Sequence, residues 1–203
     1  MKRAVSQPAA VDHHIYPLAS LISPTATLDG EAIGKTVSAA GHYIANFQAP
    51  NQLDASGNKS DWDVALLQTD TDTAILVVRG LWKDRTSSPE IVMSTNVSVT
   101  GTLQPHQSED VAENSAQQLS RLDPSVLTST TDLQLYDGYI ALTSESSRNG
   151  EVDRPRVTVA ASDYNAKVPG YYWQHISYVG IWWLMAALVL WLPFYRGEDK
   201  LTA

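Results

Sequence analysis

The sequence predicts a mainly β protein: a small antiparallel β-sheet or partly closed barrel with one or two short helices, followed by one C-terminal transmembrane helix. Three observations support this fold class. Residues 1–170 contain β-branched or period-two apolar runs, and turn residues such as Asp137-Gly138 interrupt them. No charged residue occurs from Ser177 to Tyr195. A chain of 203 residues is also long enough to bury one hydrophobic core.

Composition divides the chain into four segments. Residues 1–30 are an irregular N-terminal segment that contains Pro and Ser, and residues 31–168 are a β-rich, membrane-peripheral domain. Residues 169–197 are the transmembrane helix with its aromatic flanks, and residues 198–203 are a short tail. The bulk composition resembles that of a soluble protein, and the C-terminal helix departs from it.

Alternating or β-branched runs predict six strands in the first 170 residues. A short helix is expected within Val111–Leu122, which contains Gln and Ala and ends before Asp123-Pro124. A second helical turn is expected at Ser125–Thr128. The predicted strands are Thr36–Asn46, Trp62–Gln68, Ala74–Leu81, Val92–Leu103, Tyr139–Thr143 and Arg156–Ala160.

Two pentapeptides in this domain share the pattern V-S-x-x-G. They are Val37–Gly41 and Val97–Gly101. A glycine at the end of a strand indicates a bulge or a sharp bend, as in a small sheet that curls into a barrel. A chance match is the alternative for so short a repeat.

Charge and composition exclude several classes of function. The formal net charge of −8 argues against a nucleic-acid-binding protein, because neutralising phosphates requires clustered Lys and Arg. The absence of cysteine excludes disulfides, thiolate catalysis and Cys-based zinc sites. The sequence has no nucleophile elbow, phosphate-binding glycine loop or His-x-x-x-His pair, and His42 and His106 are interpreted as surface residues. We therefore predict no catalytic residue, no metal site and no enzymatic activity.

The uncharged run from Ser177 to Tyr195 predicts a transmembrane helix. At about 1.5 Å of rise per residue its length is roughly 28 Å, close to the ~30 Å hydrocarbon core of a bilayer. Tyr171, Tyr172 and Trp173 precede the run, as aromatic residues do at membrane–water interfaces. The alternative is a buried helix of a soluble domain, but such helices usually keep one polar face. The lipid bilayer is therefore an expected partner.

His175 has the most informative position of the histidines. On a continuous helix His175, Tyr178 and Trp182 fall at i, i+3 and i+7 and share one face. This spacing places an imidazole at the membrane–water boundary, beside two aromatic rings. One interpretation is a histidine that rests in the headgroup layer. The other is an axial ligand or hydrogen-bond donor to a flat apolar group such as haem.

The aromatic residues of this helix predict contacts with partner helices. Trp182, Trp183 and Trp191 supply large contact areas with one polar group each, and Tyr178 adds to them. Gly180 allows a neighbouring backbone to approach closely, as small residues do in membranes. These five residues are the predicted partner-binding residues.

Five short motifs resemble the surfeit-locus-one family of cytochrome c oxidase biogenesis factors. The H-x-x-Y-x-x-x-W spacing that starts at His175 resembles the opening of the family's last transmembrane helix. Four further segments follow the family's order, and the similarity spans about residues 30–197. Gly34–Tyr43 resembles its V-x-x-x-G-x-Y strand, and Ile75–Trp82 resembles its V-L-V-x-R-G-W strand. Val97–Pro105 resembles its V-x-x-x-G-x-L-x-P segment, and Tyr136–Tyr139 resembles its Tyr-Asp-Gly-Tyr turn.

The chain departs from the family's pattern in three places. Leu81 stands between Gly80 and Trp82, and Asp61–Ala65 replaces the expected Gly-Tyr and Thr-Pro. No segment that resembles the family's first transmembrane helix precedes Val11. The chain is therefore identified as a remote or specialised member.

The resemblance implies a membrane-anchored, non-catalytic protein that aids the assembly of a haem-copper cytochrome c oxidase or the insertion of its haem. It implies haem as the cofactor and His175 as the haem contact. The alternative is a stoichiometric accessory subunit that stabilises the mature oxidase or its supercomplex with the cytochrome bc complex. Oxidase subunits and the cytochrome bc complex are thus the expected partners.

The resemblance also implies a location. We expect a single-pass protein of the cell or inner membrane, with the β domain on the extracytoplasmic side and the C-terminus in the cytoplasm. Arg196 and Lys200 follow the helix, whereas Lys167 alone lies shortly before it, in keeping with the positive-inside rule. A tail-anchored protein with a cytoplasmic domain is the alternative, because residues 1–30 contain no recognisable export signal.

Overall fold

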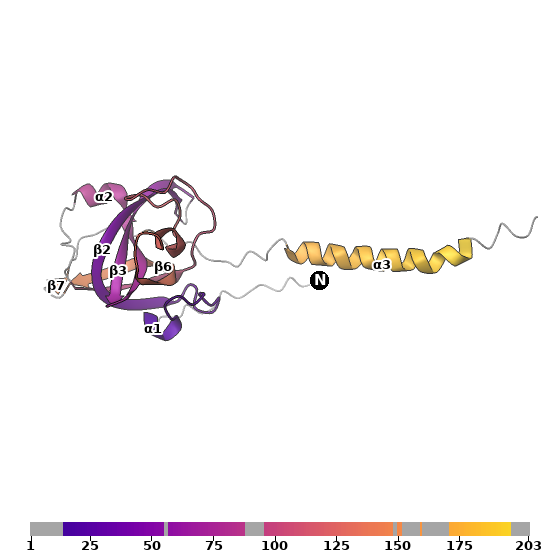
Figure 1. Ribbon diagram of the computed structural model, residues 1–203, viewed down its shortest axis with the longest axis horizontal. Coiled ribbons are helices and arrows are strands. Elements are labelled where there is room, and N and C mark those ends of the chain that lie inside the picture. The colour runs from indigo at the N-terminus through magenta and orange to yellow at the C-terminus, as the bar shows by residue number, and fades with distance from the viewer. Residues whose placement is uncertain are drawn as a thin grey trace, which may run out of the picture. The chain divides into compact units, whose positions relative to one another are not determined.

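The computed structural model describes residues 14–54, 57–87, 96–147, 150–151, 159 and 171–195, which are drawn in colour in Figure 1. The chain divides into two compact units, residues 1–164 and residues 165–203. The first unit contains the described strands and short helices, and the second contains one long helix. The elements are β1 (Ile15–Pro17), α1 (Leu18–Leu21), β2 (Thr36–Leu53), β3 (Lys59–Asp70), β4 (Thr73–Leu81), α2 (Trp82–Ser87), β5 (Val97–Gln104), η1 (Pro124–Leu127), β6 (Gln134–Ser147), β7 (Gly150–Glu151) and α3 (Tyr171–Tyr195).

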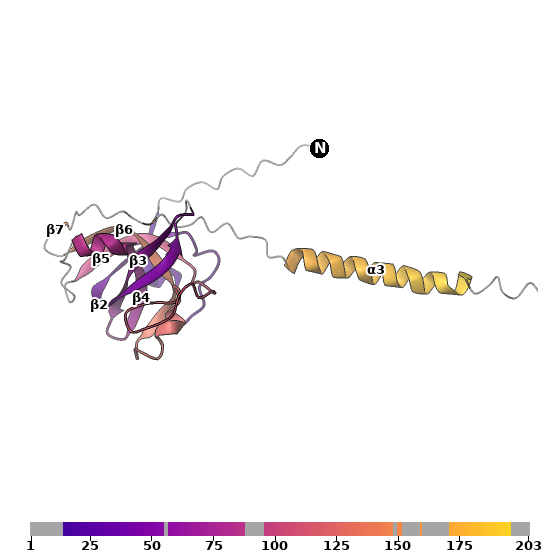
Figure 2. The same cartoon turned by 90° about the horizontal axis from the view of Figure 1, so that it is seen from above.

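Five strands of the first unit close into a barrel. Their order is β2-β3-β4-β6-β5, and β5 pairs back onto β2. β1 extends the sheet beside β2, and β7 pairs with β6. Figure 2 shows the strands of the barrel from a second direction. The predicted fold class, mainly β with a barrel and a C-terminal apolar helix, is confirmed.

The sheet is mixed, whereas an antiparallel sheet was expected. β4 and β6 are parallel partners, as are β1 and β2. Because β6 runs parallel to β4, the chain must return to the end of the barrel where β4 began before β6 can start. α2, β5 and residues 105–133 supply the long connection that a parallel pair requires. Counted along the chain, the five barrel strands β2 to β6 are the first to the fifth. The fifth strand, β6, lies between the third and the fourth, which is the strand order of Greek-key barrels of the OB type.

The two V-S-x-x-G pentapeptides form the strand pair that closes the barrel. In the ladder between β2 and β5, Val37 is opposite Gly101 and Val97 is opposite Gly41. The two copies therefore pair antiparallel with each other. Each glycine also allows a third strand to pass closely, because a Cβ on Gly41 would overlap the carbonyl oxygen of Gln68 in β3. The repeat thus marks the positions where strands of the closed barrel cross.

Two hydrophobic cores lie on the two sides of the barrel wall. The inner core contains residues of all five barrel strands, and the outer core packs residues of β2, β3, β4 and β6 beneath Leu119, Leu122 and Leu127. β3 and β4 are buried on both faces, which explains why their sequences are continuous apolar runs. A register shift between Tyr43 and Ala45 moves β2 from the inner to the outer core.

The helix predicted within Val111–Leu122 is not formed. The segment is irregular, and its backbone bonds to β2 instead. The amide of Gln48 donates to the carbonyl of Gln117 at 2.8 Å, and the amide of Leu119 donates to the carbonyl of Gln48 at 2.9 Å. These bonds replace the i to i−4 bonds of a helix and place Leu119 in the outer core. The helical turn predicted at Ser125–Thr128 is present as the 3-10 helix η1.

The predicted strands correspond to β2, β3, β4, β5 and β6, with β2, β3 and β6 longer than expected. Residues 92–95 lie outside the described residues, as does the predicted strand Arg156–Ala160 except for Val159. Val159 is buried in the outer core and is not part of a strand. The sequence did not predict β1, α1, α2 or β7. Leu18 of α1 and Ile22, which follows it, belong to the inner core, so part of the N-terminal segment packs into the barrel.

α3 is the helix of the described chain that is long and apolar enough to cross a membrane. Its span Ile176–Pro193 has a mean hydropathy of 1.7, and none of it is buried. The helix has 25 residues and a length of about 37 Å, which exceeds the hydrocarbon core by one to two turns. The predicted C-terminal apolar helix is therefore confirmed by length and composition.

Candidate functional site

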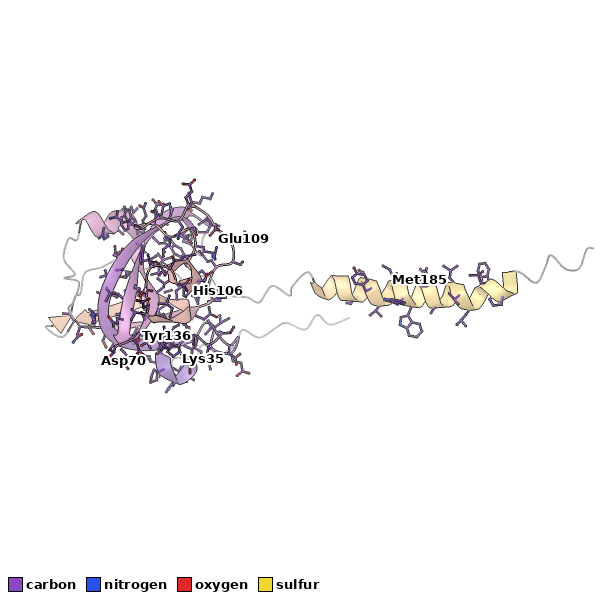
Figure 3. All side chains as sticks on the ribbon, viewed as in Figure 1. Lys35, Asp70, His106, Glu109, Tyr136 and Met185 are labelled. Atoms are coloured by element: carbon purple, nitrogen blue, oxygen red, sulfur yellow. The ribbon has the colours of Figure 1, made fainter. Side chains whose placement is uncertain are left out.

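All of the predicted partner-binding residues lie in α3. Tyr178, Trp182, Trp183 and Trp191 are between 61% and 74% exposed in the isolated chain. A Cβ added to Gly180 would meet no atom within 4 Å. Figure 3 shows side chains projecting from both sides of the helix in this view, where Met185 is labelled. The surface of α3 is therefore available to lipid or to other helices.

The five residues do not share one face of α3. At about 100° per residue, Tyr178 and Trp182 lie within roughly 40° of each other, on the side where the backbone of His175 is placed. Gly180, Trp183 and Trp191 fall within roughly 80° of one another on the other side of the helix. His175, Tyr178 and Trp182 thus lie on one continuous helix at i, i+3 and i+7, and the five predicted partner-binding residues fall on two different faces of it. The side chain of His175 lies outside the described part of the structure.

A buried cluster of three side chains joins β2, β4 and β6 in the first unit. The guanidinium of Arg79 donates from Nε to Glu145 Oε2 at 3.2 Å and from Nη2 to Oε1 at 3.1 Å. The hydroxyl of Tyr43 donates to Glu145 Oε2 at 2.8 Å. The same guanidinium lies over the ring of Tyr43, 4.4 Å from its centroid. The side chains of Arg79 and Glu145 are each 7% exposed, so this ion pair is buried.

Arg79 lies on the same inner side of β4 as Ile75 and Val77, at an irregularity of the strand. Asp63 is opposite Gly80 and Val64 is opposite Val78, which leaves Arg79 as the extra residue of a bulge. Gly80 has a φ of 147°, a conformation that glycine adopts more readily than other residues. The Arg-Gly pair of the V-V-R-G motif is therefore explained by one bulge.

Similar irregularities position the other two members of the cluster. In the ladder between β5 and β6, Gly101 is opposite Leu142 and Thr100 is opposite Ser144. The extra residue between Leu142 and Ser144 changes the alternation of β6, so Glu145 faces inward. Tyr43 directly precedes the irregularity of β2. Two of the motifs noted in the sequence thus meet at Glu145, which sequence reasoning did not single out.

The chemistry of this cluster is structural. Both carboxylate oxygens of Glu145 accept hydrogen bonds, and Arg79 and Tyr43 supply all of them. A buried pair of this kind holds three strands together but leaves no carboxylate oxygen without a donor. Breaking it by removing one partner is costly, because the other charge stays buried.

The side chain of His106 also contacts another side chain, although the sequence suggested an isolated surface residue. Its Nδ1 lies 2.6 Å from Oδ1 of Asp137, and Oδ2 of Asp137 accepts the amide of Leu28 at 2.9 Å. Gly138 follows with φ +84°, and a Cβ there would overlap the carbonyl oxygen of Gln104. The Tyr-Asp-Gly-Tyr motif therefore fastens the N-terminal segment to the barrel.

The described residues contain no group of three or more His, Cys, Asp or Glu that could hold a metal ion.

A network around Arg121 holds the segment that covers the outer core. Arg121 donates to Asp110 at 2.9 Å and to Asp123 at 2.8 Å. Hydrogen bonds from Ser120 and then Arg121 lower the pKa of Asp110. Burial raises the pKa of Asp123, but hydrogen bonds from Ser125 and Arg121 outweigh burial and lower the pKa overall.

Acid should therefore destabilise this covering segment. A carboxyl group whose pKa is lowered by folding stabilises the fold above its unfolded pKa of about 3.9, and this contribution is lost as the pH falls through the folded pKa. We expect the melting temperature of the full chain in detergent to fall between pH 5 and pH 3. Asp123→Asn should melt at a lower temperature than the wild type at pH 6 and should lose less on acidification. An equal loss in both proteins would contradict this assignment.

The fold and α3 together define a class of protein: a β-barrel domain joined to one apolar helix that is a candidate membrane span. The SURF1 family model matches residues 2–187, which covers the barrel and most of α3, so the chain belongs to the SURF1 family. This family is known for cytochrome c oxidase assembly. No curated protein and no solved structure matches the chain.

Proposed function

We propose that this protein is a membrane-anchored, non-catalytic factor that aids the assembly of a haem-copper cytochrome c oxidase or the insertion of its haem. The observation that carries the proposal is the family match over residues 2–187. The structure adds two supporting features. The buried charges of Arg79 and Glu145 neutralise each other, and the aromatic side chains of α3 are exposed.

The proposal includes an orientation in the membrane. The β domain lies on the extracytoplasmic side, α3 crosses the bilayer, and the C-terminus is cytoplasmic. Support comes from Arg196 and Lys200 after the helix, because basic residues favour the cytoplasmic side. Labelling of a cysteine introduced at Thr71, in the exposed turn between β3 and β4, by a membrane-impermeant reagent would test this orientation in intact cells.

Haem is the proposed ligand of the upper part of α3. The residues fit such a group, because α3 places the position of His175 one turn before Tyr178 and two turns before Trp182, and both aromatic rings are exposed. Imidazole is a common axial ligand of haem iron, which would supply the redox chemistry of the bound group. The aromatic side chains would offer flat apolar contacts to the macrocycle.

Detergent purification of the oxidase tests the proposed function. An assembly factor should be recovered with immature oxidase intermediates and should be depleted from the mature enzyme. Recovery at constant stoichiometry with the mature oxidase, or with its supercomplex with the cytochrome bc complex, would instead support the accessory-subunit alternative. The proposal is wrong if the protein never co-purifies with respiratory complexes.

Substitutions in α3 test the haem contact in the same membranes. His175→Ala and Trp182→Ala should each lower the haem content of the oxidase or the recovery of its subunits several-fold, because they remove the proposed ligand and an adjacent ring. His42→Ala is the matched control and should leave both quantities unchanged. If the two α3 variants behave like this control, His175 is only an interfacial residue.

A further inference from the structure

The connection from β5 to β6 is long and lies over the outer core. Residues 107–131 of this connection contain the 3-10 helix η1 but no other helix and no strand. Ordered loops that exceed about 15 residues and lack regular structure are uncommon, and many of them are lids or binding loops. Three side chains of the segment, Leu119, Leu122 and Leu127, are buried in the outer core. We call residues 107–131 the lid.

The lid covers the face of the barrel on which folds of this type bind ligands. In OB barrels that face is formed by the second and third strands and the adjoining loops. The corresponding strands here are β3 and β4. Their outward side chains Trp62, Val64, Leu66, Leu76 and Val78 belong to the outer core, together with the leucines of the lid. The protein's own chain therefore occupies an apolar face that would otherwise be exposed.

The polar groups of the lid are bonded mostly to one another. The amide of Gln107 donates to the carbonyl of Leu122, and the amide of Val111 donates to the carbonyl of Ser120, each at 2.9 Å. Both ion pairs of Arg121 also lie within the lid. These interactions persist when the lid moves as a unit, so such a movement leaves few polar groups of the lid without partners.

The lid makes few hydrogen bonds to the barrel. Among the described residues they all reach β2, and none reaches β3 or β4. The backbone of Gln48 bonds to Gln117 and Leu119, and the side chains of Asn51 and Gln52 each make one further bond to the lid. Contact with β3 and β4 is therefore apolar, and it is broken without leaving a buried polar group on those strands.

The residues beside the lid are anchored at both ends. Before the lid, His106 contacts Asp137, and after it the amide of Gln134 donates to the carbonyl of Asp72 at 2.7 Å. A hollow of about 550 Å³ is lined both by η1 and by Thr25–Thr27. Because this space separates η1 from the N-terminal segment, the lid has room to move between its two anchors.

We propose that the lid opens as one unit between these anchors and uncovers the apolar outer face of β3 and β4, while the five barrel strands stay paired. Proteins open in cooperative units, and segments with few bonds to their surroundings open most readily. The closed lid is then an autoinhibitory contact, because a ligand of the covered face binds only the open state and shifts the protein towards it. This inference is independent of the proposed function.

Cysteine labelling tests the lid, because the chain contains no cysteine of its own. Val77 and Val78 are neighbours in β4, but Val77 lies in the inner core and Val78 in the outer core. In the full chain in detergent, the thiol of the Val78→Cys variant should react with iodoacetamide at least about tenfold faster than that of Val77→Cys. Urea should accelerate the reaction of Val78→Cys less steeply, because lid opening exposes less surface than global unfolding. Val64→Cys, opposite Val78 in β3, is the second variant if Val78→Cys does not fold.

A cysteine on the lid itself identifies the moving part. The thiol of Leu119→Cys should react at least as fast as that of Val78→Cys, because the two positions lie on opposite sides of the same contact. Equal rates and equal urea dependence for Val78→Cys and Val77→Cys would show that only global unfolding exposes the outer face, and the proposal would be wrong. Slow labelling of Leu119→Cys beside fast labelling of Val78→Cys would show that the face opens by a different motion and would also overturn it.

Discussion

Replacing Arg79 by methionine should lower the free energy of unfolding by about 3–5 kcal/mol, because it leaves the Glu145 carboxylate buried without its cation. The side chains of both residues are 7% exposed, so water cannot replace the lost partner without opening the barrel. The hydroxyl of Tyr43 remains as a donor, but it carries no charge. Urea unfolding of the full chain in detergent measures the effect.

Two comparisons make this prediction specific. Lys35→Met removes the same charge from a less buried site, where the ammonium lies 5.1 Å from the ring of Tyr16, and should cost about 1 kcal/mol or less. The combined variant Arg79→Met, Glu145→Leu, Tyr43→Phe should recover most of the lost stability, because the cluster then contains no buried charge. If Arg79→Met resembles Lys35→Met, the ion pair does not hold the strands together.

The β-rich fold was predictable because hydrophobic patterning is local. The continuous apolar runs of β3 and β4 identify strands whatever their neighbours are. The pairing of β4 with β6 was not predictable in this way, because it depends on where the chain returns after residues 105–133. The same limit explains the error at Val111–Leu122, whose backbone bonds to β2 override its helical composition.

The candidate site likewise contains residues grouped by their spacing along the sequence and residues brought together only by folding. His175, Tyr178 and Trp182 share a face of one helix, so their spacing alone was sufficient to group them. Arg79 and Glu145 are 66 residues apart in the chain. They meet because Arg79 follows the inward alternation of β4, whereas a bulge in β6 turns Glu145 inward, and period-two alternation does not specify a bulge.

Closure of the barrel should depend on Gly101 as strongly as on the ion pair. A Cβ at this position would overlap the carbonyl oxygen of Ala141 and would lie 2.7 Å from Cγ2 of Ile140. One obstacle is backbone and the other belongs to a fully buried side chain, so neither moves without separating β5 from β6. Gly101→Ala should therefore lower the free energy of unfolding by about 3 kcal/mol or more.

The matched control is Gly30→Ala, because a Cβ at Gly30 would meet no atom within 4 Å. That variant should stay within about 1 kcal/mol of the wild type and should tend to stabilise, since alanine restricts the unfolded chain. Both variants add one methyl group in place of a hydrogen, so a difference between them reports on the strand crossing and not on composition. Equal urea midpoints for the two variants would show that β5 and β6 can separate at Gly101 without cost, and the barrel would then not be closed at this crossing.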